Sequence, residues 1–376
     1  MPISTASALW RTLKKTSRPR RQNASAARVS KERPAGILND AIGIGTRQLL
    51  SRSGALRAMQ TPTGLIRPLG LICETVNICN CDCVFCPYSL QTRKFGTMDS
   101  DLFVEVCRQY AAMGGGPMSL TPIVGDLLLD KHLADRVETL RRYRHAIQPS
   151  FTTNLYALDR HSDEVISRML EVFIRIHVSV YGITAEENEA ITQRKHFHKL
   201  PEQARRLANL WERSSQRCSV WVSFRNLYQH PPDVLGHYVT DNFGRSEWFK
   251  GGAATEYFNW GGRMSGPLPG DAQFVPVSEN HHICTLLPFG MQIYWDGRVS
   301  ACSCCDYDAG KDLALGDLRQ QSLIEMYNGA VNRQIWADQE SGKMQDICRK
   351  CTFHLPLTRL LTAPPIGQGW TDLAGG

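Results

Sequence analysis

Residues 75–87 read TVNICNCDCVFCP, and this stretch decides how the rest of the chain is interpreted. Three of its cysteines, Cys79, Cys83 and Cys86, stand in the spacing C-x3-C-x2-C. Thiolates are soft ligands that suit iron–sulfur chemistry, and three of them on one short loop can hold three irons of a [4Fe–4S] cube. The fourth iron is then left without a protein ligand, so a small molecule can chelate it.

Two other interpretations of this loop remain open. A structural zinc site needs four closed ligands, usually arranged as two pairs, and Cys81 would have to supply the fourth. Because C-x-C-x-C-x2-C is cramped for tetrahedral closure, an open cluster is favoured over zinc and over free buried thiols. Cys81 is then not a ligand, and its role is unassigned.

Length and cysteine usage narrow the class of protein. The chain has 376 residues, enough for roughly two domains of ~100–200 residues. It contains no apolar stretch near the ~18 residues that a membrane helix needs, and its start lacks the apolar block of a secretory signal. Thirteen cysteines in such a chain are more typical of metal ligands or catalysts than of disulfides. We expect a cytoplasmic protein that does not bind a membrane.

The net charge of +7 is concentrated at the N-terminus. Residues 1–35 hold nine Lys or Arg side chains and one acid, which leaves the rest of the chain at −1. This composition is typical of a disordered tail, and it also fits an organelle transit peptide or a tether to an anionic surface. A nucleic-acid surface across the whole fold is not expected.

Between residues 65 and 260, strand patterns alternate with amphipathic helices. The expected strands cover 69–76, 120–124, 149–154, 173–181 and 219–224. The expected helices cover 99–113, 130–144, 162–171 and 201–213, and one or two more over 37–59 lead into the core. Such alternation predicts parallel β/α units, and five or more units indicate an α/β fold with an open or incomplete barrel.

The cysteine loop, the strand before it and the aromatic Phe85 before the third cysteine resemble the radical S-adenosylmethionine (SAM) superfamily. The resemblance covers residues 65–260 and implies a partial (β/α)6 barrel. It implies that the open iron binds the amino and carboxylate groups of SAM. It also implies that the reduced cluster cleaves SAM to a 5′-deoxyadenosyl radical, which takes a hydrogen atom from a substrate carbon. An electron donor such as flavodoxin or ferredoxin would then be a partner.

The resemblance also implies cofactor-binding positions outside the loop. Gly125 and Asp126 stand where the family has a Gly-Gly-Glu-type strand end that touches the SAM amino group, although Val124 and Asp126 depart from that pattern. Ser179 would contact the ribose and Arg194 the carboxylate of SAM. Strand-end caps and surface charges are the alternative for these positions. The implied set is Phe85, Gly125, Asp126, Asn154, Ser179 and Arg194.

A second cysteine pattern follows a Gly/Pro-rich stretch at 244–280. Cys284-x12-Gly297-x4-Cys302 spans an expected hairpin (290–295 and 298–302), and Cys348-x2-Cys351 follows an expected helix at 322–336. Two thiols from a hairpin and a C-x2-C pair can close around a metal, and zinc is one interpretation. The hairpin pattern resembles the SPASM/twitch extension. Because no cysteine follows Cys351, the resemblance is to the truncated twitch form, a small α+β domain.

The twitch resemblance implies an auxiliary [4Fe–4S] cluster on Cys284, Cys302, Cys348 and Cys351. Cys304 or Cys305 could replace Cys302 as a ligand. These two, together with Cys218, are also candidate hydrogen-atom donors to the substrate. The alternative is a bystander thiol, or for Cys218 a core residue.

These patterns divide the chain and bound its function. The expected parts are a basic tail (1–35), a helical lead-in (36–64), a radical SAM core (65–260), a linker (261–280), a twitch-like domain (281–360) and a loose C-terminus (361–376). We expect dehydrogenation or epimerisation of a sugar or aminocyclitol in a biosynthetic pathway. A maturase acting on a ribosomally made peptide is the alternative, and a non-catalytic iron–sulfur or zinc protein is the third.

Overall fold

The computed structural model describes residues 48, 50–52, 55–277, 280 and 282–358. The expected tail at 1–35, most of the helical lead-in and the expected C-terminal segment 361–376 lie outside the described residues. Helix α4 (Ala55–Met59) belongs to the lead-in. Of the helices in the described ranges, none has both the length and the apolar content needed to cross a bilayer.

One nine-stranded sheet organises the molecule, with the strand order β11-β10-β9-β1-β2-β3-β4-β5-β6. The pairings from β1 to β6 are all parallel, which confirms the expected α/β fold. These six strands are β1 (Gly70–Cys73), β2 (Gly116–Ser119), β3 (Ile147–Thr153), β4 (Arg175–Tyr181), β5 (Ser219–Arg225) and β6 (Phe249–Ala254).

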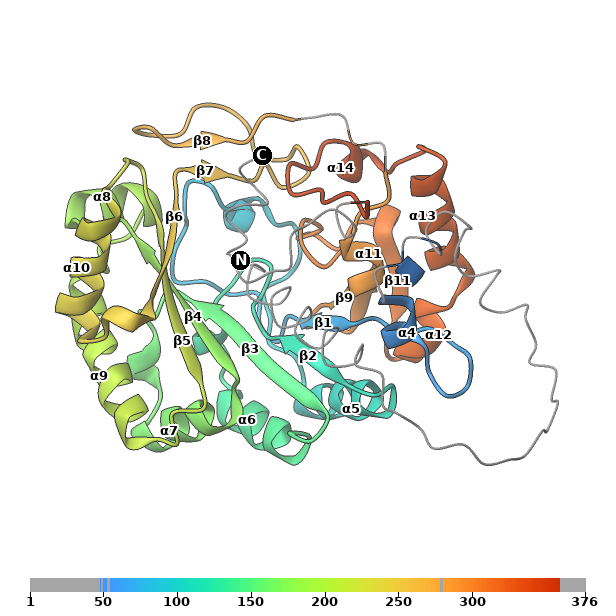
Figure 1. Cartoon of the computed structure of the whole chain (residues 1–376), viewed down its shortest axis with the longest axis horizontal. Coiled ribbons are helices and arrows are strands. Elements are labelled where there is room, and N and C mark those ends of the chain that lie inside the picture. The colour runs from blue at the N-terminus through green and yellow to red at the C-terminus, as the bar shows by residue number, and fades with distance from the viewer. Residues whose placement is uncertain (1–47, 49, 53–54, 278–279, 281, 359–376) are drawn as a thin grey trace.

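Helices connect the parallel strands and lie along the outer side of the sheet (Figure 1). Their ends follow local chemistry: Asp99 and Ser162 accept backbone N–H groups at two helix starts, and Gly244 ends another in the left-handed region at φ +66°. The connecting helices are α5 (Ser100–Ala112), α6 (Leu133–Arg142), α7 (Asp163–Val172), α8 (Ala185–Thr192), α9 (Leu200–Arg213) and α10 (Pro232–Phe243). Short 3-10 turns are η1 (Pro87–Leu90), η2 (Leu127–Leu129), η3 (Leu158–Arg160), η4 (Phe197–Lys199), η5 (Ser246–Trp248) and η6 (Lys311–Leu313).

The strand expected at 120–124 is wrong, because β2 ends at Ser119. Its sequence, GPMS, follows two glycines and has little of the apolar character of a strand. The apolar run after it is buried for another reason. Ile123 and Val124 pack in a separate hydrophobic cluster with Trp260, Tyr294 and Tyr307.

Two further expectations in the C-terminal half need correction. The Gly/Pro-rich stretch at 244–280 is not only a boundary, since it contains β6 and the small two-stranded sheet of β7 (Glu256–Tyr257) and β8 (Gln273–Phe274). The single helix expected at 322–336 is two helices, α12 (Leu323–Tyr327) and α13 (Ala330–Glu340). The break occurs where Asn328 bonds the backbone of Ile66 through both its amide nitrogen (2.7 Å) and its oxygen (3.1 Å).

The C-terminal hairpin is present and belongs to the main sheet. Strands β9 (Gly290–Ile293) and β10 (Arg298–Ser300) pair antiparallel, and β11 (Ala314–Asp317) pairs with β10. Strand β9 also pairs in parallel with β1, with Gly70 opposite Gly290 and Cys73 opposite Ile293. The C-terminal segment is completed by the short helices α11 (Leu286–Phe289) and α14 (Asp346–Arg349) beside α13.

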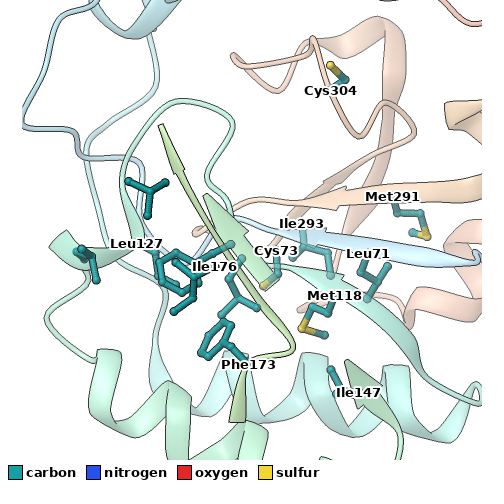
Figure 2. Close-up of a cluster of buried hydrophobic side chains, with 14 of the residues drawn as sticks. Leu71, Cys73, Met118, Leu127, Ile147, Phe173, Ile176, Met291, Ile293 and Cys304 are labelled. Carbon is teal, nitrogen blue, oxygen red and sulfur yellow. The ribbon is translucent and has the colours of Figure 1, made fainter. Parts of the chain in front are cut away.

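The core crosses the junction between the hairpin and the barrel strands. Leu71 and Cys73 of β1, Met118 of β2, and Met291 and Ile293 of β9 are buried in one hydrophobic cluster (Figure 2). Burial of each such large side chain contributes about 1.5–3 kcal/mol. The hairpin is therefore bound to the barrel strands by both backbone pairing and a shared core.

A buried ion pair at the end of β1 also joins the two halves of the chain. Glu74 and Arg93 form a bidentate contact, with Nη1–Oε1 at 2.5 Å and Nη2–Oε2 at 2.9 Å. Arg93 Nε also donates to the Tyr307 carbonyl at 2.7 Å, and its guanidinium lies over the ring of Tyr294. Because Tyr294 and Tyr307 belong to the C-terminal segment, this arginine holds that segment against the loop that follows the cysteines.

We predict that Arg93→Met destabilises the protein by about 3–5 kcal/mol, because it leaves the Glu74 carboxylate buried without a partner. Thermal unfolding of the anaerobically purified protein would measure the loss. Arg108→Met is the matched control, since Arg108 pairs with Glu105 on the surface and its removal should leave the stability nearly unchanged. Equal stability of the two variants would contradict the prediction.

Candidate functional site

The cysteine loop follows β1 and is anchored by backbone hydrogen bonds on two sides. Asp126 N–H donates to the Ile78 carbonyl at 2.9 Å, while Asp82 and Val84 donate to the carbonyls of Thr192 and Ile191 at the end of α8. The sequence analysis missed α8, although Thr184 caps its start by accepting the Glu187 N–H. This helix end fixes the loop against the barrel.

The thiols of this loop are gathered and shielded. Cys81 lies between Cys79 and Cys83 in the loop, and its backbone N–H donates to Cys79 Sγ at 3.4 Å. Cys81 and Cys83 are buried, and Cys79 and Cys86 are half-buried. Burial raises the pKa of Cys86 to about 12, and the pKa of Cys83 is also raised. These thiols therefore stay neutral unless a cation replaces their protons, as an iron–sulfur cluster does.

The thiols of the loop lie close together but are not arranged around one position for a single metal ion. Among the described residues, no three His, Cys, Asp or Glu side chains stand around a position that would hold a single metal ion. The donor set itself, several thiols on one anchored loop, has the chemistry that iron–sulfur clusters use.

Asn154 and Gly125, both expected near the cofactor, lie against the loop. The Asn154 amide donates to Asn80 Oδ1 at 2.7 Å and to Cys81 Sγ at 3.5 Å. Gly125 has φ +156°, and a Cβ at this position would meet the Val76 carbonyl oxygen at 3.0 Å. Only glycine fits this backbone approach without a shift, so Gly125 sets how closely the segment between β2 and η2 approaches the start of the loop.

Asp126 is occupied by protein donors. Its carboxylate accepts the Thr153 hydroxyl at 2.9 Å, the Asn154 N–H at 2.8 Å and the Leu128 N–H at 2.9 Å. Burial raises the pKa of this carboxyl to about 6 in spite of these bonds. In the structure Asp126 connects the start of η2 to the end of β3, and the contact with SAM that the resemblance implies stays a prediction.

The remaining predicted cofactor positions are Ser179 on β4, Arg194 after α8 and Phe85 in the cysteine loop. Ser179 is buried on β4, in register with Ser223 of β5. Arg194 is exposed two residues beyond α8, whose end anchors the cysteine loop. Phe85 stacks on Tyr257 with ring centroids 3.9 Å apart and an interplanar angle of 6°.

A cavity of about 510 Å³ opens beside Phe85, between β4, β5 and β6. One part of its wall is aromatic and includes Phe85, Tyr257 and Trp260. Trp260 is fixed against the cysteine loop by donating from Nε1 to the Phe85 carbonyl at 2.9 Å. The sequence analysis missed the polar residues of the cavity. Every second residue of β4 (177, 179 and 181) pairs with every second residue of β5 (221, 223 and 225). These positions hold polar and aromatic residues, and this pattern was the signal in the sequence that could have indicated a cavity wall. The side chains that line the cavity include His177, Trp221, Ser223, Arg225, Asn226 and Tyr257.

The second cysteine set lines a small pocket in the C-terminal segment. The Cys305 and Cys351 Sγ atoms are 3.4 Å apart, and Cys304 Sγ is 3.7 Å from Cys305 Sγ. Burial raises the pKa of Cys284 to about 11 and that of Cys302 to about 12. The pocket contains all four predicted ligands and the two additional thiols: Cys284, Cys302, Cys304, Cys305, Cys348 and Cys351.

Two of the predicted hydrogen-atom donors therefore lie with the second thiol set. Cys304 and Cys305 line the thiol pocket and do not line the cavity beside Phe85. Cys218 also lies outside that cavity, before the first residue of β5, and burial raises its pKa to about 12. Cys218 is buried in the hydrophobic core, and its role as a hydrogen-atom donor stays a prediction.

Two family models match the chain. The model described as the radical SAM superfamily matches residues 73–217, and the SPASM model, described as an iron–sulfur cluster-binding domain, matches residues 284–352. The region matched by the radical SAM model contains the cysteine loop, and the region matched by the SPASM model contains the cysteines of the thiol pocket. No curated protein matches the chain.

Solved structures with a similar fold include two that contain different bound molecules. The structure of BtrN in complex with AdoMet and 2-DOIA has 16% identity and a TM-score of 0.51, and the match covers 76% of this chain and 93% of that chain. The structure of SuiB from Streptococcus suis bound to the precursor peptide SuiA has 12% identity and a TM-score of 0.55, covering 96% and 83%. At these identities the similarity shows the fold alone.

We predict that Gly125→Ala lowers the iron that the first loop retains after anaerobic reconstitution, because the added Cβ pushes the segment between β2 and η2 away from the loop. Iron and sulfide counts would measure this. Gly64→Ala is the control, since Gly64 also has a positive φ but a Cβ there meets nothing within 4 Å. An unchanged iron count in Gly125→Ala would contradict the prediction.

Proposed function

The chain belongs to the radical SAM superfamily and carries a SPASM-type iron–sulfur domain, and from this premise we propose that it starts a radical reaction on a small organic substrate. The observation that supports this most directly is the position of Phe85. It lies between Cys83 and Cys86 in the sequence and on the wall of the cavity in space. The loop that would hold the cluster therefore borders the space that would hold the substrate.

Cys79, Cys83 and Cys86 would hold the [4Fe–4S] cluster and leave one iron open for SAM, with Ser179 and Arg194 as the nearby groups for its ribose and carboxylate. When bound and reduced by a donor such as flavodoxin or ferredoxin, this pair supplies a 5′-deoxyadenosyl radical that abstracts hydrogen from a substrate carbon. Cys81 is left out of this set because the C-x3-C-x2-C spacing is complete without it.

The aromatic wall would exclude water from the reacting groups. Phe85 is stacked against Tyr257 and is 2% exposed, and the Trp260 indole both covers it and bonds its carbonyl. These contacts leave the loop little freedom to move away from the cavity. A rigid, dry wall limits side reactions of a radical with solvent.

Cys284, Cys302, Cys348 and Cys351 would hold the auxiliary cluster. Two buried amides support them: Gln339 accepts the Cys284 N–H at 2.9 Å and donates to Cys348 Sγ at 3.3 Å, and Asn280 donates to the carbonyls of Cys348 and Cys351 at 2.9 Å. Such outer contacts orient ligands in metal sites. Four protein ligands leave no open iron, which suits the site to electron transfer or to ordering this segment.

The reaction proposed is dehydrogenation or epimerisation of a sugar-like substrate. A cavity of about 510 Å³ with both aromatic and polar walls suits a compact, polar molecule. Maturation of a ribosomally made peptide is the second candidate. It is favoured by the fold similarity to SuiB, whose structure contains a precursor peptide.

We predict that Cys83→Ala abolishes SAM cleavage, because only two thiolates of the loop set then remain. Production of 5′-deoxyadenosine under reducing, anaerobic conditions would measure this. Cys81→Ser is the matched control and should retain the first cluster. A Cys83→Ala variant that still makes 5′-deoxyadenosine would refute the assignment of the first site.

Cys348→Ala should remove only the auxiliary cluster. The iron count is expected to fall from about eight to about four per chain, while the open cluster and its spectral response to SAM remain. Quantified iron and electron paramagnetic resonance of the reduced protein would measure both. An unchanged iron count would remove Cys348 from the ligand set.

A further inference from the structure

The inner wall of the cavity carries three connected polar side chains that the reaction above does not use. Arg225 Nη1 donates to Ser223 Oγ at 3.2 Å and to the Phe224 carbonyl at 3.0 Å. Ser223 Oγ lies 2.6 Å from Nε2 of His177. Arg225, Ser223 and His177 are 9%, 6% and 5% exposed, and all three line the cavity.

The hydrogen bonds give this wall a direction. While Ser223 Oγ accepts from Arg225, its own proton can be donated to His177 Nε2, and in this arrangement, which we assign from the hydrogen-bond network, the imidazole proton is on Nδ1. Burial and the nearby Arg225 and Arg175 hold the pKa of His177 well below its ordinary value, so the ring is neutral. Among the described residues, the buried Nδ1 has no hydrogen-bond partner. It remains as a donor for a ligand.

Arg225 brings a buried positive charge to the same wall. Within the described part of the chain, no carboxylate forms an ion pair with its guanidinium, and only Nη1 has hydrogen-bond partners. The buried acid nearby, Glu187, is occupied by His230 at 3.0 Å and by the Leu227 N–H at 2.8 Å. A buried cation without a counter-ion is unfavourable, so an anion in the cavity would stabilise it.

The other charged groups of the cavity are exposed. Lys250, Glu256 and Asp271 line it at solvent-accessible positions, where water screens their charges. Asn226, next to Arg225, is 1% exposed and its Oδ1 has no partner among the described residues, so it can accept from a hydroxyl. The buried wall thus offers one cation, one neutral donor and one carboxamide.

We propose that Arg225, Ser223 and His177 form a subsite for an oxyanion, a carboxylate or phosphate group, carried by the substrate. The guanidinium fork matches either group through two parallel N–H donors, and His177 Nδ1–H adds a third. This inference rests on the proposed function and narrows its substrate class to anionic sugar-like molecules. It disfavours an aminocyclitol, whose ammonium groups would be repelled by Arg225.

Four probes that share one ring test the subsite: glucuronate, glucose 6-phosphate, glucose and glucosamine. Their binding to the reconstituted full-length protein with SAM can be measured by saturation-transfer NMR. At least one of the two anions should bind about tenfold or more tightly than glucose, with glucosamine weakest. The tighter anion then identifies the group as carboxylate or phosphate.

Arg225→Gln should abolish the preference for anions, and Ser223→Ala, a smaller change that keeps the charge, should weaken it. Arg245→Gln is the matched control, since Arg245 pairs with Glu212 away from the cavity, and it should keep the preference. Equal binding of all four probes, or a preference that survives Arg225→Gln, would overturn the proposal. So would a parallel loss of SAM affinity in Arg225→Gln, which would assign the wall to the cofactor.

Because probe binding needs no turnover, this outcome is independent of SAM cleavage. Absence of an anion preference in the unmodified protein, with intact 5′-deoxyadenosine production, would reject the subsite alone. Failure of SAM cleavage in the unmodified protein would reject the proposed function alone.

Discussion

The parallel pairing of β1 with β9 is the constraint on which the arrangement of the molecule depends. β1 is bonded to β2 on one side and to β9 on the other, so the loop that leaves β1 and the hairpin that carries the second cysteine set belong to one sheet. Glu74, the first residue after β1, continues this connection by donating its N–H to the Ile293 carbonyl at 2.8 Å. Both thiol sites are therefore positioned from the same strand.

Two kinds of buried polar group can be distinguished here: those that stabilise the fold and those that can bind a ligand. Glu74 with Arg93, and Asp130 with Arg136, are paired within the protein and hold elements together. Arg225 is buried and, among the described residues, forms no ion pair with a carboxylate, while the loop thiols are shielded and neutral. A buried cation without a counter-ion fits an external anion, and several thiols on one loop fit an iron–sulfur cluster.

The sequence predicted the parts of the site that depend on local spacing. The loop cysteines and the hairpin with Gly297 at its turn could be identified because their order in the chain is also their order in space. The cavity wall could not, because His177 and Ser223 are 46 residues apart and meet only through the register of β4 with β5. The four cysteines predicted for the second site lie in one pocket, whereas the place of Cys304 and Cys305 stayed open in the sequence, because Cys305 meets Cys351 only after β9 and β10 turn the chain back.

The charge of the cavity wall cannot be attributed to the composition of the chain. Outside residues 1–35 the net charge is −1, so an average buried site would have no reason to be positive. Arg225 is nevertheless held in place by Ser223 and by the Phe224 carbonyl, and Gly252 on β6 leaves room for Ser223, because a Cβ there would approach the Ser223 Cβ to 3.0 Å. A neighbouring strand that makes space for the residue supporting a buried cation is difficult to explain by packing alone. It is consistent with a wall shaped for a ligand. This part of the cavity is polar, whereas the part formed by Phe85 and Tyr257 is aromatic.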